Sequence, residues 1–440
     1  MHDPTEPVAL AALDACFALA RERLACADPP LGATMDAAAL REALAGAITA
    51  EGVGVERAMA LVRDVIAPAS VALDGPRFLA LVPAAPTVAA KAFDAVVGVH
   101  SFSGESWLEA AGPVAAENQA LQVLADAAGM PPEAGGCFVS GGSAGNLAAL
   151  AVARDTGGGV GSTVVVSEAA HASVTRAAHL LGLHTRAVAG DERGRLTRAA
   201  LEPHLDDSTT AVVASAGTTN TGTIDDLAGI ADLCAERDVW VHVDAAYGGG
   251  ALFAPSARSR FNGIELADSI VIDPHKWLFG PLDCGALLYR DPARAVPTFR
   301  QEASYLELLH AEGGWNPSDY AFHLTRRTRG LPLWFSLVVY GLAAYTRAIE
   351  RVLELARDAA ALVDAAPHVE LLLEPELSVV VFARPGWSAQ DYLHWARALF
   401  DAQVAFLVPT RFNGNVVARA VFLHPDTDLS VFAAALAAMR

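Results

Sequence analysis

The middle of the chain alternates between short apolar runs and amphipathic segments, and this alternation restricts its fold more than any other feature. Residues 171–181 and 224–237 repeat their apolar positions every three to four residues, which is typical of helices that cover a sheet. The β-branched runs around them are 163–166, 210–215, 239–244 and 269–273. Strands that alternate with helices in this way predict an α/β fold with a mostly parallel central sheet and helices on both faces.

The regions on either side of this sheet follow other patterns. Residues from about 35 to 130 have helical periodicity, and from about 349 a long helix leads into a mixed region. In that region the apolar runs are 369–373, 377–382, 404–408 and 416–422, with a helical segment at 389–400. We therefore predict an N-terminal helical segment (1–95), a large α/β domain (96–345) and a small C-terminal α+β domain (346–440).

Charge and cysteine content exclude several classes of function. Asp and Glu (50) outnumber Lys and Arg (31), and the resulting net charge of −19 repels nucleic acid and anionic lipid. The five cysteines form no CxxC pair and no zinc-ligand spacing with histidine, so we expect reduced thiols and no metal site. The stretches 134–153 and 330–346 are uncharged, but their glycine or proline content favours buried core over membrane spans. No signal sequence is predicted at the start, and a cytoplasmic location is expected.

A glycine-rich turn at 140–146 follows an apolar run that ends at residue 139. Ligands of open α/β sheets bind beyond the carboxyl ends of the strands, so this turn lies where a ligand is expected. Its glycines let backbone amides approach an anion, and Ser143 can add a hydroxyl at a helix N-terminus. The turn lacks the GK[ST] of a P-loop and a GxGxxG fingerprint, so it predicts a phosphate site of another kind, with an ordinary capped turn as the alternative.

Three further polar clusters follow apolar runs at the same predicted edge of the sheet. His171 opens a helix, Thr218 lies in the polar turn 215–222, and Asp244 ends the run 239–244. A buried carboxylate is costly without a cationic partner. Asp244 therefore either has a positive partner or does not end a buried strand.

Lysine is almost absent from the chain, which contains only Lys91 and Lys276. Arginine stays protonated, whereas a lysine can lose its proton and condense with a carbonyl group. Lys276 follows the run 269–273 and so reaches the same sheet edge as Asp244, whereas Lys91 lies in an Ala-rich helical stretch. We expect Lys276 to be the reactive one.

These clusters together supply what pyridoxal 5'-phosphate (PLP) requires: an amine for its aldehyde, an anion for its ring nitrogen, a planar group for its ring and amides for its phosphate. The sequences His-Val-Asp-Ala-Ala-Tyr (242–247) and Pro-His-Lys-Trp (274–277) make the chain resemble the group II PLP-dependent amino acid decarboxylases, the family of aromatic-L-amino-acid decarboxylase. The resembling motifs extend from about residue 76 to 419. The resemblance implies a fold-type I enzyme with PLP as its cofactor.

The resemblance also implies roles for single residues. Lys276 would form the Schiff base with PLP, Asp244 would pair with the pyridinium nitrogen, and His171 would stack on the ring. The other implied cofactor contacts are Ala246 on the opposite ring face, Thr218 near the ring substituents, Gly142 and Ser143 at the phosphate, and His275 beside it.

Members of the resembling family are homodimers with active sites at the subunit interface. The resemblance therefore implies a homodimer in which the N-terminal segment packs on the partner. It also places a mobile catalytic loop at about 295–324, with Tyr305 as a catalytic residue. The aromatic residues Phe78, Phe102 and Trp107 fall in the segment that lines the family's substrate pocket.

The expected reaction is the decarboxylation of an L-amino acid to an amine and CO2. An aromatic lining favours an aromatic substrate, and the net charge disfavours acidic ones, although Arg77 could serve an acidic side chain. An oxygen-using aldehyde synthase is an alternative, but relatives of that type tend to have phenylalanine where this chain has Tyr305. A decarboxylase of another amino acid and a catalytically silent PLP-binding protein are the remaining alternatives.

Overall fold

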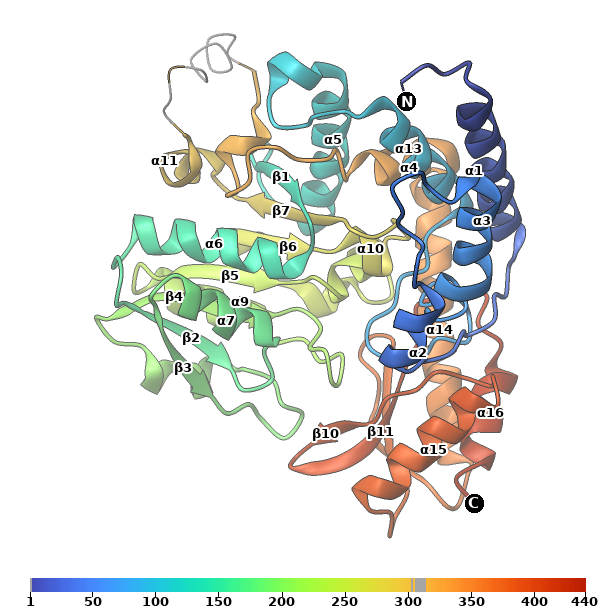
Figure 1. Cartoon of the computed structure of the whole chain (residues 1–440). Coiled ribbons are helices and arrows are strands. Elements are labelled where there is room, and N and C mark those ends of the chain that lie inside the picture. Colours follow the sequence, from blue (N-terminus) through green and yellow to red (C-terminus); the bar gives the residue numbers. More distant parts are fainter. Residues whose placement is uncertain (1, 302–303, 305–313) are drawn as a thin grey trace.

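The computed structural model describes residues 2–301, 304 and 314–440, and its centre is a seven-stranded sheet in the order β1-β7-β6-β5-β4-β2-β3 (Figure 1). The strands are β1 (Gly135–Val139), β2 (Thr163–Ser167), β3 (His184–Val188), β4 (Thr209–Ser215), β5 (Trp240–Asp244), β6 (Ser269–Ile272) and β7 (Gly285–Tyr289). β7 pairs antiparallel with both of its neighbours, and the other pairs are parallel. Every strand except β7 therefore ends at the same edge of the sheet.

Both faces of this sheet are buried, as the apolar runs predict. Val164 and Val166 of β2 pack in one hydrophobic cluster with α6 (Gly142–Thr156) and α7 (Ala172–Leu180). Val165, between them, points to the opposite face and belongs to a second cluster that includes α9 (Leu227–Ala235). Successive side chains of a strand point to opposite faces, so the prediction of helices on both faces is confirmed.

The sequence patterns miss two strands and misplace one. β3 at the sheet edge is mostly exposed and contains no apolar run, and β7 was not among the expected strands. Residues 404–408 form no strand; Ala405 and Leu407 are buried, the others are half-buried, and Phe406 makes only an isolated bridge to Phe78. The third strand of this region is instead the short β10 (Thr410–Phe412).

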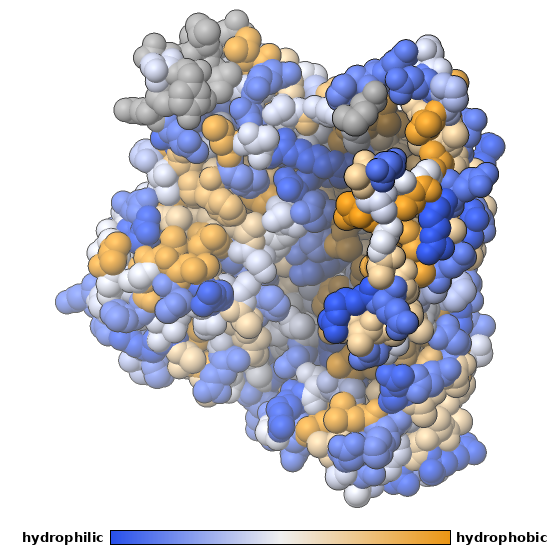
Figure 2. All heavy atoms as spheres, in the orientation of Figure 1, coloured by the Kyte–Doolittle hydropathy of each residue, from blue (hydrophilic) through white to orange (hydrophobic). Residues whose placement is uncertain are grey.

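The N-terminal part is helical, and its first helix precedes the stretch from about residue 35 in which helical periodicity was noted. The helices are α1 (Pro7–Ala25), α2 (Ala37–Ala43), α3 (Gly54–Leu61) with a π-helical turn at Val62–Ile66, α4 (Val88–His100) and α5 (Trp107–Ala128). α1 has no buried residue and exposes Leu13 and Phe17 by about half of their surface (52% and 51%). Figure 2 shows hydrophobic residues at the surface over this part of the molecule.

The C-terminal part begins with α13 (Leu331–Tyr340) and α14 (Leu342–Asp364), which Gly341 separates with a positive φ of 73°. It continues with an antiparallel sheet in the order β10-β11-β9-β8 and two helices. These elements are β8 (Glu370–Leu373), β9 (Val379–Ala383), α15 (Ala389–Asp401), β11 (Asn415–Val421) and α16 (Leu429–Ala437). Across the described residues, no helix is long and apolar enough to cross a membrane.

The two sheets share one hydrophobic core. Val241 and Val243 of β5 belong to the same cluster as Val379 and Val381 of β9. The buried Tyr247, just after β5, adds a polar link, because its hydroxyl lies 2.6 Å from Ser378 Oγ and accepts the Ser378 N–H at 2.8 Å. The turn after β5 is therefore fixed to the C-terminal sheet.

Short helices complete the chain around the sheet edges. They are α8 (Arg198–Leu201), α10 (Pro274–Trp277), α11 (Val296–Phe299) and the 3-10 turns Glu202–His204, Gly248–Phe253, Arg258–Phe261, Ile264–Leu266, Pro292–Arg294 and Pro317–Asp319. A buried ion pair, Arg326 to Glu117 at 2.7 Å, holds the segment before α13 against α5. Glu117 also accepts the Gly330 N–H at 2.8 Å, so the start of α13 is fixed as well.

Candidate active site

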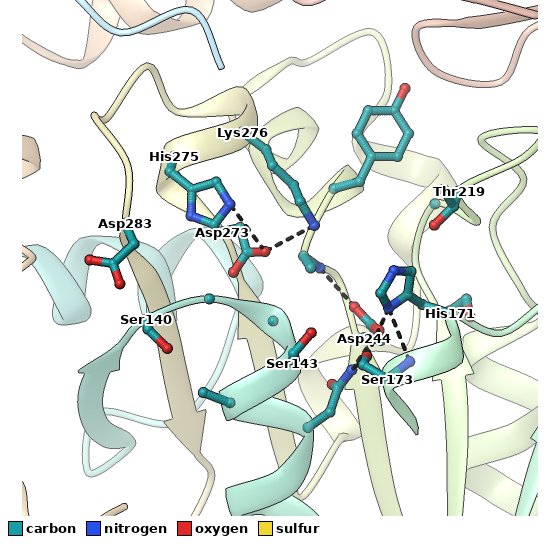
Figure 3. Close-up of a pocket in the computed structure, with 18 of the residues that line it drawn as sticks. Ser140, Ser143, His171, Ser173, Thr219, Asp244, Asp273, His275, Lys276 and Asp283 are labelled. Atoms are coloured by element: carbon teal, nitrogen blue, oxygen red, sulfur yellow. Dashed lines mark hydrogen bonds and ion pairs between the residues drawn. The ribbon is translucent and has the colours of Figure 1, made fainter. Parts of the chain in front are cut away.

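A cavity of about 420 Å³ opens at the edge where the parallel strands end. Turns after β1, β2, β4, β5 and β6 line it, and Figure 3 shows their side chains converging from these separate elements. The eight residues expected to contact the cofactor all lie on its wall: Gly142, Ser143, His171, Thr218, Asp244, Ala246, His275 and Lys276. The fold thus brings together residues that are up to 134 positions apart (276 minus 142).

Lys276 extends into this cavity from α10, which begins directly after β6. Its Nζ lies 2.9 Å from Asp273 Oδ2, and the Asp273 side chain is only 2% exposed (Figure 3). Burial by itself would lower the pKa of Lys276, but the charges of Asp273 and Asp244 outweigh burial and raise it. Without a ligand, the amine is therefore held as an ammonium group.

Asp244 ends β5 with its carboxylate facing the cavity. Its Oδ2 accepts a hydrogen bond from Asn146 Nδ2 at 2.9 Å, and its Oδ1 accepts the Ala246 N–H at 3.1 Å. Both of these donors are neutral. A cationic ring nitrogen entering the cavity would find a carboxylate already fixed in position.

His171 caps the N-terminus of α7 and stays exposed to the cavity. Its Nδ1 accepts the Ser173 N–H at 3.3 Å and lies 2.8 Å from Ser173 Oγ. These contacts use one ring nitrogen and leave the other facing the cavity. Thr218, in contrast, is buried, and its hydroxyl bonds with that of Thr221 at 2.7 Å.

The glycine-rich turn fits a phosphate group by its shape and its donors. α6 begins at Gly142, where a Cβ atom would come within 2.9 Å of the Ala246 side chain, so the close approach of the backbone requires glycine. The exposed Ser143 adds a hydroxyl at this helix N-terminus. Asp273 lines the same corner, and its Oδ1 has no donor among the described residues. A bound group that carries a proton would satisfy that oxygen.

Comparison with known proteins identifies the family. Residues 160–384 match the pyridoxal-dependent decarboxylase conserved domain. The aromatic-L-amino-acid decarboxylase of Bacillus atrophaeus is 33% identical over 367 residues, which cover 80% of this chain and 76% of that protein. The chain belongs to the pyridoxal-dependent decarboxylase family. The L-2,4-diaminobutyrate decarboxylase of Rhizobium meliloti (strain 1021) is 34% identical over 393 residues, 85% of this decarboxylase and 79% of that one.

Solved structures agree with this family. A rice (Oryza sativa) TDC structure with PLP and tryptamine superposes with a TM-score of 0.90 at 23% identity, covering 100% of this decarboxylase and 98% of that chain. Mouse CSAD superposes with a TM-score of 0.89 at 25% identity, covering 99% and 98%. The fold class expected from the sequence is therefore confirmed. The protein is a PLP-dependent amino acid decarboxylase.

Several expected site residues lie elsewhere in the decarboxylase. Phe78 is buried in the core against Phe406, with ring centroids 4.9 Å apart, because its segment pairs with the buried chain at 406. Phe102 stacks on His100 at 5.0 Å, and neither Phe102 nor Trp107 lines the cavity of this chain. Among the described residues, the cavity lining therefore lacks the three aromatic residues expected for the substrate pocket.

Two other expectations concern Arg77 and Tyr305. Arg77, considered for an acidic substrate, is used structurally: it pairs with Asp28 at 2.8 Å and donates to the Gln403 carbonyl at 2.6 Å. Tyr305 lies outside the described residues. Of the stretch 295–324 that was expected to be loop, the described ends contain α11 and a 3-10 turn at Pro317–Asp319.

Some residues of the decarboxylase site had no role in the sequence interpretation. Asn146 and Asp273 were noted only as members of their turns, and Ser173 was not singled out. A signal for one further residue was present: His242 precedes Asp244 by two positions on a strand, so both side chains point to the same face. The partners of these residues come from distant parts of the chain and could not be read from spacing alone.

Proposed function

We propose that this decarboxylase converts an aromatic L-amino acid, with uptake of one proton, to the corresponding amine and CO2. The charge of the cavity disfavours an acidic substrate, and the names of relatives support the aromatic class. Its described lining contains three carboxylates, Asp244, Asp273 and Asp283, and no arginine. An acidic side chain would therefore be buried without a bidentate cationic partner, which is costly. Several relatives named aromatic-L-amino-acid decarboxylases support the aromatic class.

PLP, when bound, supplies the electron sink for the electron pair that remains when CO2 leaves. Lys276 would hold it through its amine, and Asp244 would keep a proton on the ring nitrogen. His171 and Ala246 would pack on the two ring faces, and Thr218 would lie near the ring substituents. The phosphate would lie at Gly142 and Ser143, with His275 beside it.

Asp273 has a further part in this proposal. Lys276 must lose a proton before its amine can act as a nucleophile. Asp273 Oδ2, at 2.9 Å, stabilises the ammonium form and so opposes this loss while the ion pair is in place. The next carboxylate to influence the amine is Asp244, which the proposal reserves for the ring nitrogen.

We also propose that the chain works as a cytoplasmic homodimer whose N-terminal segment packs on the partner. α1 exposes Leu13 and Phe17, and α4 exposes Val99 by 70% of its surface. Hydrophobic side chains that gather on exposed helices commonly mark a protein interface. A partner at this surface could also supply further aromatic residues to the cavity.

A panel of amino acids tests the substrate class. We expect L-tryptophan, L-tyrosine and L-phenylalanine to release CO2 and amine with kcat/KM about 10²-fold or more above L-glutamate, because an unpaired buried charge is strongly rejected. CO2, amine and hydrogen peroxide should be measured in parallel on the PLP-loaded enzyme. A preference for L-2,4-diaminobutyrate or L-glutamate would overturn the substrate class. Release of no CO2 from any amino acid would favour a silent PLP-binding protein.

Tyr305 tests the choice between amine and aldehyde as product. A phenol placed near the α-carbon can deliver the proton that completes the amine. Without it, reaction with O2 and water would give aldehyde, CO2, ammonia and hydrogen peroxide in equal amounts. We expect wild type to form mainly amine, and Tyr305→Phe to keep CO2 release while aldehyde and peroxide rise. The exposed Tyr340 provides the matched control, because Tyr340→Phe should leave the products unchanged.

Mixed dimers extend this test to the subunit interface. If Tyr305 acts in the partner's site, a dimer of one Tyr305→Phe chain and one Lys276→Ala chain contains one site with both residues intact. Co-purified mixed dimers with two affinity tags should then form amine without peroxide at about half the wild-type rate. Aldehyde as the main product of mixed dimers would place Tyr305 in the site of its own chain, and unchanged products in Tyr305→Phe would remove it from the proton transfer.

A further inference from the structure

A set of buried polar residues lies directly behind the Asp244 carboxylate. Trp240, His242 and Asp244 alternate along β5, so their side chains share one face of the sheet. That face is covered by α6, which brings Asn146 against it. Asn146 and His242 are both 0% exposed. Buried polar groups at this depth are costly unless each has a partner.

The first half of this set is a hydrogen-bonded chain that leads to His242. Ser269 of β6 lies opposite His242 in the parallel register. Its hydroxyl oxygen accepts the Trp240 indole N–H at 2.9 Å and lies 2.9 Å from His242 Nδ1. The indole can only donate, so the Ser269 hydroxyl hydrogen is free to donate to His242 Nδ1.

The second half leads from His242 to the cavity. His242 Nε2 lies 2.8 Å from Asn146 Oδ1, which can only accept, so Nε2 carries the proton. Asn146 Nδ2 then donates to Asp244 Oδ2 at 2.9 Å and to Ser173 Oγ at 2.9 Å. Ser173 in turn contacts His171 Nδ1 at 2.8 Å. The Asn146 amide therefore contacts Asp244 directly, and it reaches the exposed His171 through the Ser173 hydroxyl.

The His242 imidazole in this hydrogen-bonded set is neutral. Burial lowers the pKa of His242 to about 4, although the charge of Asp244 opposes the change. The Nε2–H that faces Asn146 is thus a fixed neutral donor at neutral pH. Each residue from Trp240 to Asn146 can donate a hydrogen bond to the next one, and the last of these bonds ends on the Asp244 carboxylate.

We propose that Asn146 and His242 are positioning residues that keep the proton on the cofactor's ring nitrogen by holding Asp244 ionised, and that Asn146 couples Asp244 to His171. This inference rests on the role proposed above for Asp244. Hydrogen bonds to a carboxylate stabilise its charged form and make it a weaker base. Without the Asn146 donor, Asp244 becomes more basic and draws the proton away from the ring nitrogen, so the electron sink weakens.

The protonation of the ring nitrogen can be observed directly. Holoenzyme reconstituted with PLP that carries ¹⁵N in its ring should give, for wild type, the ¹⁵N chemical shift of a pyridinium. Asn146→Leu and His242→Phe remove donors at similar volume, and we expect their signals to move toward that of a neutral pyridine. Their kcat should fall about tenfold to a hundredfold with little change in KM, which is the scale of a hydrogen bond to a charged group.

Two further variants separate positioning from simple structural damage. His242→Gln retains a donor near the Nε2 position, so it should restore the pyridinium signal that His242→Phe loses. Ser173→Ala cuts only the branch to His171 and should leave the ring-nitrogen signal in place. Thermal unfolding of each apo-protein measures stability separately. If Asn146→Leu does not fold, the two His242 variants decide the question.

The possible outcomes distinguish this inference from the function on which it rests. A neutral pyridine signal in wild type would refute the proposed role of Asp244 itself. A pyridinium signal in wild type that persists in Asn146→Leu and His242→Phe would refute the positioning role and leave the proposed function intact. Equal loss of signal in His242→Phe and His242→Gln would also overturn it, because a conservative donor should have rescued the site.

Discussion

Replacing Lys276 by alanine should abolish turnover and the covalent attachment of PLP while the protein stays folded. Lys276 is one of only two lysines in the chain, and it alone extends into the cavity. Loss of a nucleophile of this kind is expected to lower kcat by on the order of 10⁴-fold or more. Wild type should absorb visible light through its attached cofactor, and the variant should lose that band.

Because the chain has only two lysines, peptide mapping can identify the residue that attaches PLP without ambiguity. Borohydride reduction of the holoenzyme followed by peptide mapping can label only Lys276, Lys91 or the N-terminus. Lys91 provides the control, because it pairs with Asp74 at 2.8 Å outside the cavity and Lys91→Ala should retain both cofactor and activity. A label on Lys91, or a visible band that survives in Lys276→Ala, would refute the assignment.

Folding of the Lys276 variant needs its own control. Alanine leaves the buried Asp273 with only His275, whose Nε2 lies 3.7 Å away and whose pKa is lowered by burial, and the loss of the lysine charge can cost several kcal/mol of folding stability. Lys276→Arg keeps a positive charge beside Asp273 but cannot condense with an aldehyde. We expect Lys276→Arg to unfold at a temperature closer to that of wild type than Lys276→Ala does, and to be equally inactive.

Replacing Asp244 by asparagine should have the second largest effect. The change removes the charge opposite the ring nitrogen at almost constant volume, so kcat should fall on the order of 10²–10³-fold with a smaller change in KM. Single-turnover measurements of CO2 release on fully loaded enzyme isolate this step from product release. Asp283 offers the matched control: it lines the same cavity but is paired with Arg329 at 3.0 Å, and Asp283→Asn should be far less damaging.

The same substitution should also affect stability, for a reason visible at the site. The Asp244 carboxylate accepts from both Asn146 and the Ala246 N–H, whereas an asparagine side chain has a single oxygen. One buried donor loses its acceptor, at a cost of roughly 1–3 kcal/mol. Calorimetry of the apo-protein measures this cost. Near-normal decarboxylation by Asp244→Asn would show that another group holds the ring nitrogen.

Most strands of the central sheet could be predicted from sequence because they are buried on both faces, although β7 was missed despite equal burial. The run that forms β5 is apolar apart from His242 until Asp244, and such a run followed by a carboxylate predicts both a strand and its functional end. β3 has no comparable signal, because an edge strand can be polar and its position depends on pairing with β2. Residues 404–408 fail in the opposite sense, since partial burial accompanies an apolar run there without a strand.

The candidate site also contains residues that could be predicted from sequence and residues that could not. His171, Asp244 and Lys276 follow separate strands, and parallel strands end at one edge, so sequence order predicts their convergence. The hydrogen-bond partners of these residues cannot be predicted from the order of strands in the sequence. Asn146 meets Asp244 across 98 positions, and only the packing of α6 on β5 brings them together. Phe78 shows the reverse error, because an aromatic residue in a plausible segment can be used for core packing.

The hydrogen bond between Tyr247 and Ser378 has a consequence for the order of biosynthesis. The two residues are 131 positions apart, and the core around them is continuous from β5 to β9. On the ribosome, the turn that follows Asp244 emerges long before the strand that secures it. The central sheet can begin to form early, but its catalytic edge gains its last support only when the C-terminal sheet has been synthesised. Truncation after the central sheet would therefore leave the cofactor residues present and their geometry unsupported.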